Sequence, residues 1–161
     1  MWELLIPLFL NIGSILITEG IKGFAGQLGS EGGTETAKGI KAGFSRCFDK
    51  IKLKLSNNDE AKKVLEDFEI EPENVNNNKQ LVIILNELLK NESGLVADIE
   101  DLVNQAKKSG LKMNIDLKIY GVKTAKVFEG GQMQSGEYNT KVEVKDTEDF
   151  TFAKDVNFGR Q

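Results

Sequence analysis

The chain has 161 residues, a formal net charge of −4, one cysteine and no histidine. This length allows one ordinary domain, or a small domain with an appendage. The lack of histidine excludes Ser-His-Asp and Cys-His triads, histidine bases and nearly all zinc enzymes. The lone Cys47 excludes an intramolecular disulfide and a cysteine metal cluster, and the acidic balance argues against a protein that coats nucleic acid.

The charges are unevenly distributed along the chain. Residues 34–63 contain eight Lys or Arg against four Asp or Glu, a net of +4. Residues 64–105 contain ten acids against two lysines, a net of −8. A basic stretch therefore adjoins an acidic one, a pattern that is typical of solvated helix faces.

The N-terminal run "WELLIPLFLNIGSILI" (residues 2–17) is the most apolar part of the chain. It predicts a helix with a bend near Pro7 or at Gly13. A secretory signal is not expected, because Glu3 precedes the first basic residue, Lys22. The run is short for a membrane span, so two readings stay open: a buried central helix, or a helix released into a bilayer. The residues assigned to insertion are Trp2, Leu5, Leu8, Phe9, Ile12, Ile15 and Leu16.

A ladder of glycines at every third position follows this run, at Gly20, Gly23, Gly26, Gly29 and Gly32. Glycine weakens a helix by up to about 1 kcal/mol relative to alanine. It also allows another helix to approach closely. The sequence therefore predicts a marginal helix here, with the first four glycines serving as a hinge or a packing face.

A basic amphipathic helix is predicted for residues 34–55, with Thr34 as its N-cap. Its apolar stripe is Ala37, Ile40, Phe44, Phe48 and Ile51, and Cys47 is expected to be a packing residue. The basic residues suit an anionic membrane surface, although a bundle helix with a basic outer face has the same pattern. The lysines assigned to the membrane-facing surface are Lys38, Lys41, Lys50, Lys52 and Lys54.

Three further helices are predicted before residue 110. One lies in residues 60–70 and is broken at Pro72, the next begins at Lys79, and the last begins at Ser93 and ends at a lysine pair followed by Gly110. We thus expect a mainly α protein in which residues 1–110 form a bundle of about five helices.

From Leu111 the apolar period changes to two, which predicts a β-rich C-terminal region over residues 111–161. Two alternatives stay open: a small β-meander packed on the bundle, or strands that pair between molecules through exposed edges. The residues assigned to assembly are Tyr138, Asn139, Val142, Val144, Phe150, Phe152, Val156 and Phe158.

The layout resembles a group of small bacterial proteins whose N-terminal domain is analogous to the fungal HeLo pore-forming domains, sometimes called Bell domains. The resemblance rests on "TETAKGIKAGF", "EAKKVLEDFEIEPE" and "LVIILNELLKN", and on the tail pieces "GEYNTKVEV" and "VNFGRQ". It implies a bacterial immune or cell-death effector without enzymatic activity, cofactor or metal. Its tail would assemble with other copies and with an upstream signalling protein.

The resemblance also implies a cytoplasmic protein that reaches the inner membrane on activation. Anionic membrane is then a further partner, and nucleic acid is not. The alternative function is a soluble adaptor whose N-terminal helix stays in the bundle core while the tail docks a partner. An enzyme would need a carboxylate pair such as Asp98 and Asp101, which we interpret as part of a solvated helix face.

Overall fold

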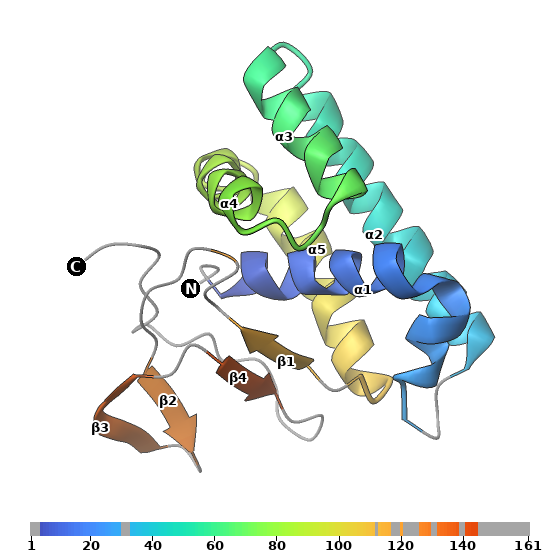
Figure 1. Cartoon of the computed structure of the whole chain (residues 1–161), viewed down its shortest axis with the longest axis vertical. Helices are drawn as coiled ribbons and strands as arrows, with labels where there is room; N and C mark the ends of the chain where they lie inside the picture. The colour runs from blue at the N-terminus through green and yellow to red at the C-terminus, as the bar shows by residue number, and fades with distance from the viewer. Residues whose placement is uncertain are drawn as a thin grey trace.

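The computed structural model describes residues 4–29, 33–111 and 120, and the backbone of four strands beyond them. The described part is mainly helical, which confirms the predicted five-helix bundle (Figure 1). Its helices are α1 (Leu5–Gly26), α2 (Thr34–Lys54), α3 (Asp59–Ile70), α4 (Val75–Leu89) and α5 (Ser93–Lys108).

The apolar helix α1 lies across the middle of the bundle (Figure 1). It packs against α2, α4 and α5, and α3 packs against α4. Helix α3 contacts α2 through Phe68 on Phe48 and through the ion pair of Glu69 with Lys52. A helix that is apolar on all sides needs neighbours around most of its circumference. The central position of α1 provides them.

The predicted apolar stripe of α2 is confirmed as core, because all five of its residues are buried. The same period places Ala61, Val64, Leu65 and Phe68 of α3, and Leu95, Ile99, Leu102 and Ala106 of α5, on one face each, and these residues are buried as well. In α4, Leu81 and Leu85 are buried, whereas Ile84 and Leu88 are half-buried. Cys47 is also buried, as expected of a packing residue. Amphipathic periodicity therefore identified the inward faces of these helices.

Four phenylalanines connect three helices through the core. Phe9 of α1 stacks on Phe44 of α2 with ring centroids 4.8 Å apart. Phe44 stacks on Phe48 at 5.4 Å, and Phe48 contacts Phe68 of α3 at 5.9 Å. Such aromatic pairs contribute about 0.5–1.5 kcal/mol each beyond the burial of their surface, so this row fixes the position of α1 against α2.

Asparagine side chains define the starts of two helices. The Oδ1 atom of Asn58 accepts from the backbone N–H of Ala61 at 3.0 Å, and Oδ1 of Asn74 accepts from that of Asn77 at 2.9 Å. These caps satisfy N–H groups that have no partner within the helix. Because Asn74 is a cap, α4 begins at Val75, and the prediction of a start at Lys79 was wrong.

Two other predicted helix features differ in the structure. Thr34 is the first residue of α2 and Gly33 is the N-cap, so Thr34 does not cap the helix. The bend in α1 lies neither at Pro7 nor at Gly13 but at Gly20. Pro7 occupies the first turn of α1, where its missing N–H removes no hydrogen bond within the helix.

The end of α5 is a Schellman motif. Gly110 takes the left-handed conformation at φ 90°. Its N–H donates to Lys107 O at 3.0 Å, and the N–H of Leu111 donates to Ala106 O at 3.2 Å. This pair of bonds is the signature of the motif, and it confirms the helix stop that lysine followed by glycine predicts.

The strands beyond α5 form two antiparallel pairs. β1 (Met113–Asp116) pairs with β4 (Lys141–Val144), with Met113 opposite Val144 and Asp116 opposite Lys141. β2 (Lys126–Glu129) pairs with β3 (Gln132–Tyr138). β1 also packs against α1. The β-rich character of residues 111–161 as a whole stays a prediction, because most of these residues lie outside the described part.

Candidate functional site

Five of the seven residues assigned to membrane insertion are core residues of the bundle. Leu5, Leu8, Phe9 and Ile12 are 0% exposed, Leu16 is 7% exposed and Ile15 is half-buried. Trp2 lies outside the described residues. Within the described part α1 is the one helix that is long and apolar enough to cross a membrane, a property that core helices share.

Helix α1 is broken at Gly20 by a conformation that only glycine adopts readily. Its φ of 72° and ψ of −178° lie outside the helical region, in a part of φ/ψ space that is essentially restricted to glycine. Two residues earlier, Oγ1 of Thr18 donates to Ser14 O at 2.8 Å, a bond that often accompanies helix bending. The predicted hinge therefore coincides with an observed break at Gly20.

The other glycines of the ladder occupy different surroundings. A Cβ on Gly23 would meet the side chain of Glu19 in the same helix, and a Cβ on Gly26 would meet nothing within 4 Å. Gly29 lies against the backbone of Gly110, and its N–H donates to Ser109 O at 3.2 Å. Close packing at the ladder is thus found at Gly29, and Gly32 lies outside the described residues.

Two glycines outside the ladder are close-packing positions that sequence reasoning missed. A Cβ on Gly13 of α1 would collide with the ring of Phe44, and a Cβ on Gly43 of α2 would lie 2.9 Å from Cδ1 of Leu102. Each glycine leaves room for a large side chain of the next helix. Gly13 is isolated in the sequence, whereas Gly43 follows Gly39 at the four-residue spacing that lets helices approach closely, a signal that could have found it.

The lysines assigned to a membrane-facing surface divide into two groups. Lys50, Lys52 and Lys54 pair with Asp98, Glu69 and Glu92 at 2.6, 2.8 and 3.2 Å. These acids belong to α5, to α3 and to the turn before α5, so the pairs connect α2 to its neighbours. Lys38 pairs within α2, with Glu35 at 3.5 Å, and Lys41 is exposed. The first half of α2 therefore carries its positive charge outward.

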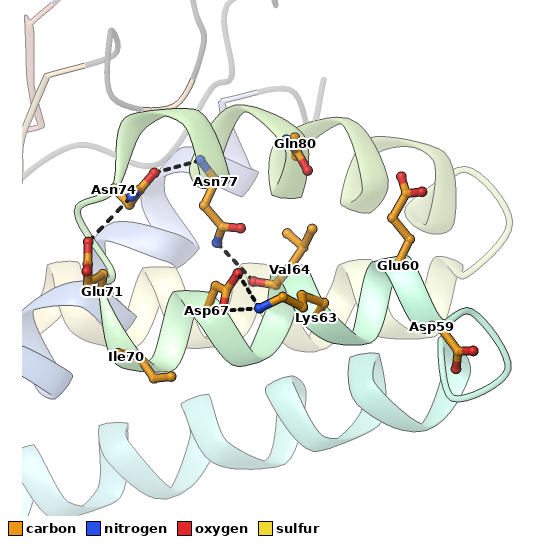
Figure 2. Close-up of a pocket in the computed structure, with 10 residues that line it drawn as sticks. All are labelled: Asp59, Glu60, Lys63, Val64, Asp67, Ile70, Glu71, Asn74, Asn77 and Gln80. Atoms are coloured by element: carbon orange, nitrogen blue, oxygen red, sulfur yellow. Dashed lines mark hydrogen bonds and ion pairs between the residues drawn. The ribbon is translucent and has the colours of Figure 1, made fainter.

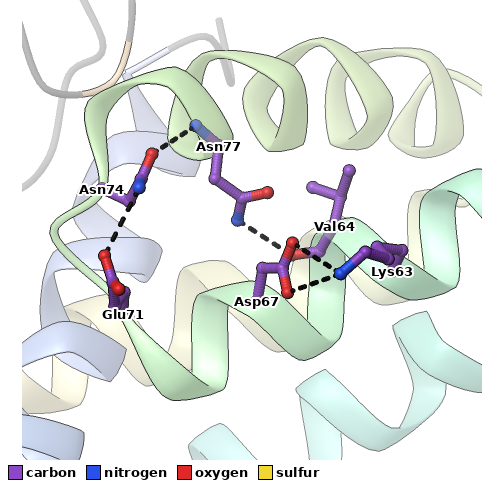
Figure 3. Close-up of polar contacts among 6 residues, drawn as sticks. All are labelled: Lys63, Val64, Asp67, Glu71, Asn74 and Asn77. Atoms are coloured by element: carbon purple, nitrogen blue, oxygen red, sulfur yellow. Dashed lines mark hydrogen bonds and ion pairs between the residues drawn. The ribbon is translucent and has the colours of Figure 1, made fainter.

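An open groove of about 740 Å³ runs between α3 and α4 (Figure 2). One polar contact joins the two helices across it, and others lie within α3 and at the turn (Figure 3). Asn77 Nδ2 donates to Val64 O at 2.9 Å, and Lys63 Nζ lies 3.3 Å from Asp67 Oδ1. The Nδ2 atom of Asn74 donates to Glu71 Oε2 at 3.4 Å. The groove is the polar seam of a helical hairpin.

Metal and acid–base chemistry receive no support from the described side chains. Among residues 4–29, 33–111 and 120, no group of three or more His, Cys, Asp or Glu is arranged to hold a metal ion. Asp98, one of the two acids weighed as a catalytic pair, is the partner of Lys50. Burial raises the pKa of the Cys47 thiol, and the negative charge of Asp98 adds to the effect, which disfavours the reactive thiolate.

Two buried polar atoms in the described part have no hydrogen-bond partner: Oδ1 of Asn78 and the hydroxyl of Tyr120. Both residues are 0% exposed. The Nδ2 atom of Asn78 donates to Pro72 O at 2.9 Å, which fixes the turn before α4. Burial and then the carboxylate of Glu73 raise the pKa of Tyr120. Neither residue is marked in the sequence as a core position.

The residues assigned to assembly are described only in part. Tyr138 is the last residue of β3, and Val142 and Val144 belong to β4, but their side chains lie outside the described part. Asn139, Phe150, Phe152, Val156 and Phe158 lie wholly outside it. Intermolecular β-pairing therefore stays a prediction.

No family model, curated protein or solved structure matches this chain. The resemblance to HeLo-like domains accordingly rests on the sequence pattern.

Proposed function

We propose that this protein is a non-enzymatic effector that perturbs a membrane with α1 after α1 leaves the bundle. The observation that carries the proposal is that α1 has the length and apolarity of a membrane span but is broken at Gly20. A core helix needs apolar faces but does not need the length of a bilayer. A helix that first packs in a soluble bundle and later crosses a membrane needs both properties, the spanning length and the break.

The length of α1 explains how the break would matter. A straight helix of 22 residues rises about 33 Å, against a hydrocarbon thickness of about 30 Å. The part from Leu5 to Glu19 alone rises only about 22 Å. Straightening at Gly20 would therefore convert a short core helix into one of spanning length. Glu19 and Lys22 would then need to face water or neighbouring helices.

The wider setting of this function is proposed from the sequence pattern. The C-terminal region would assemble with other copies and receive a signal from an upstream protein through β-pairing, in a cytoplasmic chain that reaches an anionic inner membrane when activated. In support, Lys38 and Lys41 keep their charge on the outer surface of α2. Basic residues beside an apolar helix favour binding to anionic lipid.

The sharpest test is Ile17→Asp. Ile17 is 38% exposed, so the bundle tolerates a charge there, whereas in a straight membrane helix it lies near the centre. A charged residue at that depth costs about 2.5–3.5 kcal/mol. We expect the full-length variant to keep the stability of the parent to within about 1 kcal/mol. It should release dye from vesicles of phosphatidylglycerol and phosphatidylcholine at least tenfold more slowly.

The matched control is Ile83→Asp, because Ile83 is an apolar residue of α4 that is 66% exposed and lies away from the basic surface of α2. It changes the net charge equally and leaves α1 untouched, so its leakage should equal that of the parent. Equal leakage by the Ile17 variant would contradict insertion of α1. A parent protein that never releases dye, even after self-assembly, would refute the proposed function.

The alternative, a soluble adaptor with α1 as permanent core, is favoured by the aromatic row. Phe9 is fully buried and stacks on Phe44, so removing α1 exposes both rings. An adaptor predicts that Ile17→Asp affects neither stability nor partner binding. It also predicts that the α1 amides exchange only with global unfolding.

A further inference from the structure

The chain after α5 returns to the core at three described places, and at one of them, β1, it packs against α1. Leu111 is 1% exposed, β1 packs against α1, and Tyr120 is fully buried in the same core. We propose that these residues, called the strap (Leu111, Met113–Asp116 and Tyr120), hold α1 in the bundle, and that undocking of Tyr120 is the step that frees α1. This inference deepens the proposed function, on which it rests.

The strap begins at a fixed point beside the end of α1. The backbones of Gly110 and Gly29 are in contact, and a Cβ on Gly110 would lie 2.5 Å from Gly29 N. The N–H of Gly29 donates to Ser109 O, and the Schellman motif directs the chain onward from Gly110. The start of the strap therefore stays in place whether Tyr120 is docked or undocked.

The far end of the strap is the Tyr120 ring. It is the largest fully buried side chain in the described part of the chain. Burial raises the pKa of its hydroxyl, and the carboxylate of Glu73, in the turn between α3 and α4, adds to the effect. Between Leu111 and Tyr120, β1 packs against α1. The strap thus joins the end of α5, a contact with α1 and a ring buried in the core.

The docking of Tyr120 is weaker than its burial alone suggests. The hydroxyl of Tyr120 is buried without a hydrogen-bond partner. It was taken out of water without replacement of the lost hydrogen bond, which opposes the closed state. An apolar side chain at position 120 would avoid this loss. Burial of the large ring favours docking, and the unsatisfied hydroxyl opposes it, so Tyr120 is suited to dock and to undock.

Hydrogen exchange of the full-length protein, measured by mass spectrometry, tests the strap with two opposite variants. Tyr120→Ala removes the ring, and α1 amides should exchange at least ~10-fold faster while α2 and α3 change less. Tyr120→Phe keeps the ring and removes the unsatisfied hydroxyl, so α1 should exchange more slowly, by up to ~10-fold. The control Leu65→Ala, in the α3 core, gives the profile of general destabilisation.

The outcomes separate the strap from the proposed function. Unchanged α1 exchange in Tyr120→Ala, or a profile like that of Leu65→Ala, overturns the strap. If Tyr120→Ala does not fold, equal or faster α1 exchange in Tyr120→Phe overturns it. Faster exchange confined to α1 without dye release from vesicles supports the strap and refutes membrane perturbation. Faster exchange with faster release supports both.

Discussion

The ring of Phe44 rests directly on the backbone of Gly13, at a place that any other residue would fill with its Cβ atom. Phe44 has no free space to retreat into, because Phe9 and Phe48 stack on it. The contact therefore fixes how closely α1 approaches α2.

Replacing Gly13 with alanine should destabilise the protein by about 1–3 kcal/mol, the usual cost of overpacking a core. Urea unfolding measures this change. Gly94→Ala is the control, because a Cβ there meets nothing within 4 Å and alanine favours the helix. A Gly13 variant as stable as the parent would show that the aromatic row is adaptable.

Gly20→Ala should lower the free energy of unfolding by about 1–3 kcal/mol, although the site has open space. The cause is the glycine-only backbone conformation, which alanine adopts at a cost of this size. Gly26→Ala is the matched control in the same ladder, and it should be neutral or stabilising by up to about 1 kcal/mol. Thermal unfolding of both variants measures the difference.

The same Gly20 variant should release dye from anionic vesicles faster than the parent. Alanine penalises the bent form and favours a continuous helix, so both effects promote a helix of spanning length. Slower release by Gly20→Ala would mean that the bend is needed in the active form, and the straightening step would then be wrong.

Cys47 should react slowly with thiol reagents in the native protein and faster with rising pH. Burial raises the pKa of its thiol, and the thiolate is the reactive form. The raised pKa also means that the protonated thiol stabilises the fold below the pKa of the unfolded thiol, and that this contribution is lost as the pH rises above it. Stability between pH 8 and 11, compared with Cys47→Ala, measures the loss.

Removing the partner of Lys50 should alter membrane binding more than stability. Asp98→Asn breaks a half-exposed ion pair, and such pairs contribute little to folding. The hydrogen bond to Asp98 and the charge of Asp98 raise the pKa of Lys50, so that pKa should fall in the variant. Flotation with phosphatidylglycerol vesicles should show tighter binding, most clearly at low salt. Unchanged binding would exclude this end of α2 from the membrane surface.

Helix existence and inward faces followed from the sequence because both depend on local periodicity. The stripe of α2 and the stop at Gly110 are examples, since each residue involved lies about one turn from the next. The start of α4 could not be predicted in this way, because an asparagine-rich segment has the composition of a loop. The structure shows that Asn74 is the N-cap and that the following asparagines belong to the helix.

The parts of the candidate site that the sequence did not reveal depend on contacts between distant residues. Gly13 matters because Phe44 lies on it, and Tyr120 is buried because the chain after α5 returns to the core. The unsatisfied oxygen of Asn78 is likewise a property of its tertiary environment. The hinge was expected from glycine spacing, but only the backbone shows that the break lies at Gly20.

The contact of Gly29 with Gly110 has a topological consequence. It brings together the two ends of the segment from α2 to α5, so these four helices form a closed unit whose entrance and exit coincide. The chain connects helix α1 to this unit beside the contact of Gly29 with Gly110. The departure of α1 would therefore leave the chain connections from α2 to α5 in place, so this unit would keep its chain path while one helix moves.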